Sequence, residues 1–196
     1  MTLRIIGGFF KGRSLKTPPK SVTRPTLGSL REAVFNIAQN EIQGARVLDL
    51  FAGSGAMGLE ALSRGAFHAT FVEQHPQAIR CIRENIHTLG LGQQSQIYPI
   101  SVEKAIRKMG ELKSQFEIVY IDPPYQMAFD LKDIVPLLSE QAVVFLETAQ
   151  NYPLTHTSHI AERKVEPMDV QQMLPPPLVL QDRKKFGGSY LHIIRL

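Results

Sequence analysis

The feature that most constrains the fold is a regular alternation of short apolar segments and longer amphipathic segments that begins at Arg46. The segments that resemble strands are 46–52, 68–73, 95–100, 116–122 and 142–148. Those with helical spacing or length are 58–65, 76–90, 102–112 and 129–138. Strands that alternate with helices of this length predict βαβ units, and therefore an α/β fold with a mostly parallel sheet and helices on both faces.

The two ends of the chain depart from this alternation. The C-terminal stretch "PLVLQDRKKFGGSYLHIIRL" predicts two strands around "DRKKFGG", an antiparallel hairpin at the sheet edge that would bring the sheet to seven strands. Residues 3–16 predict a small N-terminal β-hairpin with glycines at its turns. We therefore expect a basic N-terminal extension and arm at residues 1–24, followed by the main domain at 25–196.

Charge is distributed unevenly along the chain. The formal net charge is only +4, yet residues 1–31 carry seven basic side chains and no acidic one, and the remainder has more acidic than basic groups. Such asymmetry indicates a polyanionic partner, most often nucleic acid, although a solvated basic surface is the plain alternative. A single cysteine, Cys81, and the absence of a long apolar run predict a cytoplasmic protein without a membrane segment.

A glycine-rich loop connects the first apolar segment to the first helical one. Gly53, Gly55 and Gly58 form a G-x-G-x-x-G pattern, and Glu73 follows the next predicted strand, where a carboxylate accepts hydrogen bonds from ribose hydroxyls. This spacing favours an adenosine-containing ligand over a plain structural turn. Asp49, just before the loop, would repel a pyrophosphate and attract a cation. The pattern therefore favours S-adenosyl-L-methionine over NAD.

The sequence "DPPY", residues 122–125, ends the fourth strand of the alternation and should lie on the same sheet edge as the glycine loop. An exocyclic amine of a base is a weak nucleophile because its lone pair is delocalised into the ring. The Asp122 carboxylate and the Pro123 carbonyl are candidate acceptors for its two hydrogens. Pro123 and Pro124 would hold them in place, and Tyr125 would stack on the base. A strand-ending turn is the alternative reading.

Taken together, these motifs resemble the S-adenosylmethionine-dependent, Rossmann-like class I methyltransferases that modify exocyclic amines. The blocks "RIIGGFFKGRSLKTP", "RPTLGSLREAVFNI", "LDLFAGSGAMGLEALSRGA", "VYIDPPY" and "KKFGGSYLHIIRL" are similar in content and order to the RsmD family of bacterial 16S rRNA guanine-N2 methyltransferases. The resemblance covers essentially the whole chain. The two N-terminal blocks are its family-specific part, whereas the glycine loop and DPPY are shared by many methyltransferases.

The resemblance implies specific roles for residues of this sequence. The catalytic residues would be Asp122, Pro123, Pro124 and Tyr125. The cofactor would be bound by Asp49, Phe51, Ala52, Gly53, Ser54, Gly55, Glu73, Ser101 and Val102. In the family an Asp or Asn usually stands where this chain has Ser101, so the adenine contact would shift towards the backbone of Val102. The RNA-binding residues would be Arg4, Lys11, Arg13, Lys16, Lys20, Arg24, Arg31, Lys184 and Lys185. No metal site is expected.

The expected activity is therefore methyl transfer to the exocyclic N2 amine of a guanine in 16S rRNA, within the small ribosomal subunit or an assembly intermediate. No feature requires more than a monomer. An adenine-N6 DNA methyltransferase or a protein-amide methyltransferase would use the same chemistry, although no separate target-recognition domain is evident. A nicotinamide-dependent oxidoreductase conflicts with Asp49 and DPPY. A non-catalytic RNA-binding module conflicts with the intact glycine loop.

Overall fold

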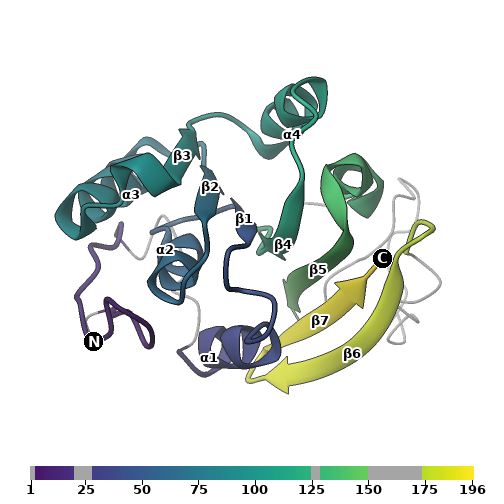
Figure 1. The fold of residues 1–196 in the computed structure, drawn as a ribbon, viewed down its shortest axis with the longest axis horizontal. Coiled ribbons are helices and arrows are strands. Elements are labelled where there is room, and N and C mark those ends of the chain that lie inside the picture. Colours follow the sequence, from purple (N-terminus) through teal and green to yellow (C-terminus); the bar gives the residue numbers. More distant parts are fainter. Residues whose placement is uncertain (1–2, 20–27, 125–128, 150–173) are drawn as a thin grey trace, which may run out of the picture.

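The computed structural model describes residues 3–19, 28–124, 129–149 and 174–196. These residues form an open seven-stranded sheet with helices on both faces (Figure 1). The strands are β1 (Arg46–Leu50), β2 (His68–Val72), β3 (Ser95–Tyr98), β4 (Phe116–Ile121), β5 (Leu138–Ala149), β6 (Val179–Phe186) and β7 (Ser189–Arg195). The helices are α1 (Gly28–Ile37), α2 (Ala56–Ser63), α3 (Pro76–Leu89) and α4 (Val102–Glu111), with the short 3-10 helices η1 (Gly92–Gln94) and η2 (Leu131–Leu137).

The strand order is β3-β2-β1-β4-β5-β7-β6. Strands β1 to β5 pair in parallel, whereas β7 pairs antiparallel with both β5 and β6. The predicted mostly parallel sheet with an antiparallel C-terminal edge is thus confirmed. Because the parallel strands point the same way, the loops that follow β1, β2 and β4 emerge at one edge of the sheet.

The turn of the C-terminal hairpin is shorter than the sequence suggested. Residues 182–186, expected to separate the two strands, belong to β6, and the turn consists of Gly187 and Gly188. β6 lies at the edge of the sheet, and its side chains are largely exposed. Charged side chains are compatible with a strand at such an edge, so the polar run misled the prediction.

The predicted N-terminal β-hairpin does not form as a pair of strands within residues 3–19. The two arms of the segment do pair, through an isolated antiparallel bridge between Arg4 and Ser14 and through backbone hydrogen bonds of Ile5 with residues 12 and 13. The pairing is too short to form two strands, and the segment also packs against α2. The amide of Phe9 donates a 2.7 Å hydrogen bond to the carbonyl of Ser63. Gly8 has φ +74°, and a Cβ there would overlap the Ser63 carbonyl. The second glycine of "RIIGG" therefore permits close docking to a helix as well as a turn.

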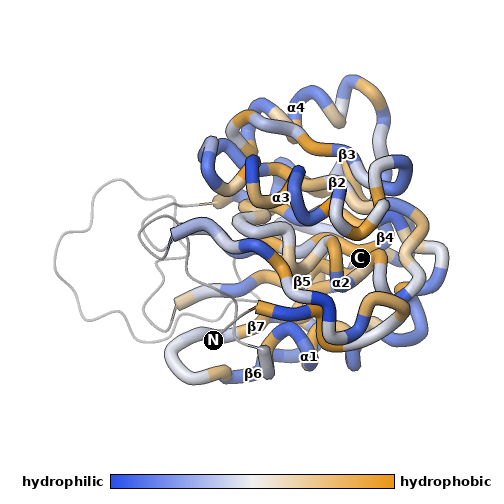
Figure 2. Tube along the Cα trace, turned by 90° about the vertical axis from the view of Figure 1, so that its left-hand side faces the viewer, coloured by the Kyte–Doolittle hydropathy of each residue, from blue (hydrophilic) through white to orange (hydrophobic). Residues whose placement is uncertain are grey.

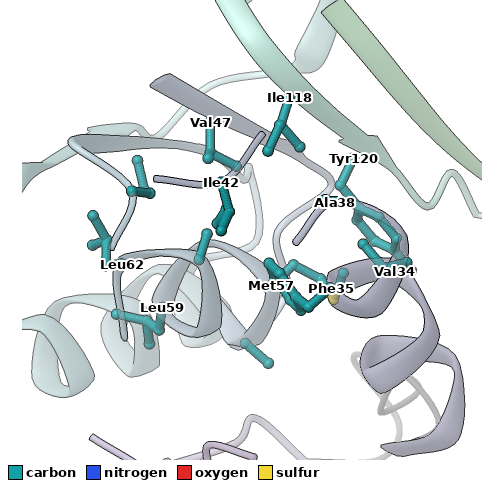
Figure 3. Close-up of a cluster of buried hydrophobic side chains, with 14 of the residues drawn as sticks. Val34, Phe35, Ala38, Ile42, Val47, Met57, Leu59, Leu62, Ile118 and Tyr120 are labelled. Atoms are coloured by element: carbon teal, nitrogen blue, oxygen red, sulfur yellow. The ribbon is translucent and has the colours of Figure 1, made fainter. Parts of the chain in front are cut away.

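The helices bury two apolar cores, one on each face of the sheet. The first lies beneath α1, α2 and α3, and Figure 3 shows Phe35 of α1 beside Met57 of α2. The same figure shows Ile118 of β4 beside Val47 of β1. The second lies beneath α4 and η2. Blue hydrophilic segments recur along α4 on the outside of the molecule in Figure 2. No helix in the described part of the chain is long and apolar enough to cross a membrane.

Gly58 brings α2 against the sheet. A Cβ at this position would overlap the ring of Phe71 on β2, so the third glycine of the motif permits close packing between helix and strand.

We expect Gly58→Ala to lower the free energy of unfolding, measured in urea, by about 1–3 kcal/mol, because the overpacked ring must move. Gly110→Ala is the matched control, since Gly110 lies in α4 with open space around its Cα. It should raise stability by up to about 1 kcal/mol. A similar loss in both variants would contradict the packing explanation.

Candidate active site

The glycine loop lies at the carboxyl end of β1, between this strand and α2. The amide of Ala52 donates a 3.0 Å hydrogen bond to the carbonyl of Val72, and the amide of Gly55 donates one of 2.7 Å to Ala52. Gly53 and Gly55 have φ values of 56° and 76°, a conformation that other residues rarely adopt. The loop therefore has a fixed path. A Cβ at Gly55 would meet the buried side chains of Ile82 and Phe71, so this glycine also permits close packing against the core.

Glu73 follows β2 and is held by three backbone amides. Its Oε1 accepts hydrogen bonds of 2.8 Å from the amides of Gln74 and His75. Its Oε2 accepts one of 2.9 Å from Gly53, which joins the two loops of the site. A carboxylate oxygen has about two acceptor positions, so Oε2 retains one for a hydroxyl donor.

Asp49 is the penultimate residue of β1 and is 1% exposed. Oδ2 accepts a 3.0 Å hydrogen bond from the amide of Gly58. Burial raises the pKa of Asp49 to about 8, with smaller contributions from the carboxylates of Asp122 and Glu73. A buried carboxyl group whose neighbours are also acids favours either a proton or a cationic ligand. The structure thus brings Asp49, Asp122 and Glu73 together, as the sequence predicted from the sheet edge.

Asp122 and Pro123 follow directly after β4. The register pairs Leu50 of β1 with Ile121 of β4, so the glycine loop and the Asp122–Pro124 stretch leave adjacent strands at equal height. Pro123 is buried, Asp122 is partly exposed and Pro124 is exposed. The arrangement offers a carboxylate and a neighbouring carbonyl beside the glycine loop. Tyr125 lies outside the described residues.

The other predicted cofactor residues surround the same edge. Phe51 adopts φ 60° and packs edge-to-face on Phe129, with 6.0 Å between ring centroids. Ser101 precedes α4 as its N-cap residue, but its side chain makes no capping hydrogen bond. Val102 is 4% exposed and buries its side chain in the core beneath α4, so its side chain is not available to a ligand.

Most of the predicted RNA-binding residues that the structure describes are exposed: Arg4, Lys11, Arg13, Lys16, Lys184 and Lys185. Lys20 and Arg24 lie outside the described residues. Arg31 corrects the prediction, because it is 2% exposed and its guanidinium lies 3.7 Å from Glu60 Oε2. Its Nη2 also donates to the carbonyl of Arg4. In this position Arg31 supports the N-terminal segment from within and does not offer a surface to RNA.

Two polar contacts of this region escaped the sequence reasoning. Asn85 of α3 is 3% exposed, and its amide joins the backbone of Lys16 to that of Ser54, so it connects the N-terminal segment to the glycine loop. Tyr120 of β4 donates a 2.7 Å hydrogen bond to Glu147 Oε2 on β5. The partners are 69, 31 and 27 residues apart, and no local pattern joins them. The one local signal for Glu147 is its own position, as a charged residue directly after the apolar segment 142–146.

The sheet order, the glycine loop with Glu73, and the Asp-Pro-Pro stretch after β4 define the class of Rossmann-like methyltransferases. The chain belongs to the family described as Conserved hypothetical protein 95, whose model matches residues 3–170.

Among curated relatives, ribosomal RNA small subunit methyltransferase D of Escherichia coli (strain K12) is 34% identical over 74% of this chain and 74% of its own length. The protein YlbH of Bacillus subtilis (strain 168) is 40% identical over 70% of this chain and 74% of its own length. The solved structure of yhhF from Escherichia coli has a TM-score of 0.77 and 29% identity, and the match covers 100% of this chain and 98% of that one. The likeness extends over both the N-terminal segment and the C-terminal hairpin.

Proposed function

We propose that this protein transfers a methyl group from S-adenosyl-L-methionine to the exocyclic N2 amine of a guanine in 16S rRNA of the small ribosomal subunit. The observation that carries the proposal is the position of Asp122 and Pro123 beside the glycine loop, on the strand adjacent to Asp49. The names of curated relatives support the rRNA substrate, since several are called ribosomal RNA small subunit methyltransferase D.

The residues of the glycine-loop edge fit this cofactor. Asp49 would bind the cationic methionine end, because a buried carboxyl group with a pKa of about 8 gains most from a positive partner. The remaining acceptor position on Glu73 Oε2 suits a ribose hydroxyl. Gly53 would allow close approach of the ligand to the backbone, and the hydroxyl of Ser101, which makes no capping hydrogen bond, would be available to the adenine.

S-Adenosylmethionine supplies an electrophilic methyl group on a sulfonium sulfur, so the enzyme must make the guanine amine more nucleophilic. The Asp122 carboxylate and the Pro123 carbonyl would each accept one hydrogen of that amine, which favours the pyramidal form with a localised lone pair. The two prolines restrict the backbone, so the acceptors need little reorganisation as charge develops on nitrogen. The methylated amine is acidic and releases its proton to Asp122 or to water.

The exposed basic residues of the N-terminal segment would contact RNA phosphates. Lys11, Arg13 and Lys16 lie on a segment that Asn85 joins to the glycine loop, so a phosphate contact there lies near the site. Lys184 and Lys185 on the exposed C-terminal hairpin would add a second basic contact, although Lys184 also pairs with Asp182.

The direct test is transfer of labelled methyl to 16S rRNA and to small subunits isolated without this modification, followed by nucleoside mass spectrometry. The proposal expects N2-methylguanosine. Methyl transfer to N6 of adenine, or binding of the cofactor without transfer to either RNA substrate, would refute it.

Asp122→Asn should reduce methyl transfer by at least about 100-fold, because the amide offers a weaker acceptor for the amine hydrogens. Cofactor affinity, measured by calorimetry, should change by no more than about threefold, because Asp122 would not contact the ligand cation. Asp133→Asn is the matched control on the exposed surface of η2 and should leave both quantities unchanged. Near-normal turnover in the Asp122 variant would remove Asp122 from the mechanism.

A further inference from the structure

Glu147 is a buried carboxylate beside the site with no role in the scheme above. It lies near the carboxyl end of β5 and is 7% exposed. The register pairs Ile121 of β4 with Leu146 of β5, so Glu147 is the next residue along β5 as Asp122 is along β4. Side chains alternate along a strand, so Glu147 shares a face of the sheet with Phe145, which packs in the same core as Tyr120.

Tyr120 orients this carboxylate. The phenol donates a 2.7 Å hydrogen bond to Glu147 Oε2. Burial, together with the nearby carboxylates of Asp122 and Glu147, raises the pKa of the Tyr120 phenol well above its ordinary value, so the phenol keeps its proton and remains a donor. Within the described part of the chain, the side chain of Glu147 accepts this hydrogen bond and no other, so its Oε1 retains acceptor capacity. Glu147 and Asp122 follow the paired residues of adjacent strands.

A carboxylate in this position can distinguish the two purines. The Watson–Crick edge of guanine presents N1–H beside the N2 amine, whereas N1 of adenine is an acceptor. A carboxylate accepts hydrogen bonds and donates none, so it matches N1–H and opposes a bare N1. Enzymes that act on an extruded base read it through hydrogen bonds to this edge. With Asp122 and Pro123 occupied by the amine hydrogens, Glu147 is a third acceptor at the end of the adjacent strand, and a guanine bound with its N1–H towards β5 would meet it.

We propose that Glu147, oriented by Tyr120, selects guanine by accepting the N1–H hydrogen bond of the target base. This inference rests on the proposed function and adds a specificity-determining residue to it. Asp122 and Pro123 recognise an amine, which adenine also carries, and Glu147 supplies the discrimination that the Asp-Pro-Pro-Tyr sequence lacks.

The test compares two RNA substrates that differ at the target position, guanosine and 2-aminopurine riboside. Both carry the amine at C2, but 2-aminopurine has a bare N1. The wild-type enzyme should prefer guanosine by about 10- to 100-fold in kcat/KM, the range that one good base contact provides. In Glu147→Gln the Tyr120 phenol should hold the amide oxygen and turn the amide N–H towards the base. The preference for guanosine should then fall at least about tenfold.

Tyr120→Phe should lower the preference by a smaller factor, because the carboxylate remains but loses its orientation. Glu140→Gln, an exposed position on the same strand, is the matched control and should keep the wild-type ratio. Thermal unfolding and cofactor binding of each variant verify that it is folded. An unchanged ratio in Glu147→Gln, even with lower activity on both substrates, would overturn the role of Glu147 and leave the proposed function intact. Failure of the wild type to produce N2-methylguanosine would overturn both proposals.

Discussion

Replacing Glu60 with alanine is expected to lower the free energy of unfolding by about 3–5 kcal/mol, the cost of breaking a buried ion pair on one side. The Glu60 carboxylate is fully buried on α2. It accepts hydrogen bonds of 2.7 Å from the amides of Ile6 and Gly7 and one of 2.8 Å from Arg64. Arg31 lies 3.7 Å away. The substitution leaves two amides and two guanidinium groups without their common acceptor, so the N-terminal segment should detach from α2.

Equilibrium unfolding in urea measures the stability change, and the rate of tryptic cleavage after Arg13 reports detachment of the segment. Glu60→Gln retains an acceptor oxygen but loses the charge, so its stability should lie between those of the wild type and the alanine variant. Glu84→Ala is the control, because its ion pair with Lys16 joins the same segment to α3 at the exposed surface. The control should leave stability and cleavage nearly unchanged. Equal effects of the Glu60 and Glu84 substitutions would contradict the anchoring role.

Local sequence signals were sufficient to predict the central part of the fold. Strands buried on both faces appear as short apolar runs, and helices as amphipathic ones, because burial acts on each segment separately. The stop of α3 at Gly90, with φ 70°, and the glycine loop after β1 follow from backbone geometry within a few residues. The position of Glu73 and Asp122 at one edge of the sheet also follows from the sequence, because residues that come directly after parallel strands lie at the same edge.

Contacts between distant residues were beyond the reach of these signals. Arg31 belongs to an acid-free basic block, and charge along a sequence does not show which side chain finds a buried partner such as Glu60. The N-terminal segment was expected to pair with itself, and short backbone pairing is present, but no local pattern shows that the amides of Ile6 and Gly7 bind Glu60 of α2. Glu147 likewise acquires its setting from Tyr120, a neighbour in space through the pairing of β4 and β5.

Asp49→Asn is expected to stabilise the protein at neutral and alkaline pH. The carboxyl group of Asp49 has a pKa of about 8 in the folded protein, raised by burial, whereas an exposed aspartate has a pKa of about 3.9. The folded state therefore binds this proton more tightly than the unfolded state, and its contribution to stability declines as the pH rises from about 4 to 8. An asparagine has no proton to lose, and its amide oxygen can still accept the hydrogen bond from Gly58.

Urea unfolding at pH 5 and pH 8 measures this effect. The decline in stability between the two pH values should be smaller in Asp49→Asn than in the wild type by about 3–4 kcal/mol, from 1.36 kcal/mol for each unit of pKa difference over that range. Asp133→Asn makes the same chemical change at an exposed position and should retain the wild-type pH dependence. Parallel pH profiles for the wild type and the Asp49 variant would show that Asp49 does not titrate abnormally.

The same substitution should weaken binding of S-adenosylmethionine, because the proposed partner of its cationic end is lost. In the wild type a cation must displace the proton of Asp49, so affinity should rise about tenfold between pH 6 and pH 7, with release of nearly one proton. Calorimetry in two buffers of different ionisation enthalpy measures that proton.

The Asp49→Asn variant should bind S-adenosylmethionine more weakly, with little pH dependence and no such release. If the variant released the same proton, the carboxyl group that titrates on binding would have to be another one. The burial of the Asp49 carboxyl group would then lower stability at neutral pH without contributing to cofactor binding. In the proposed site the same burial strengthens the interaction with the cationic cofactor.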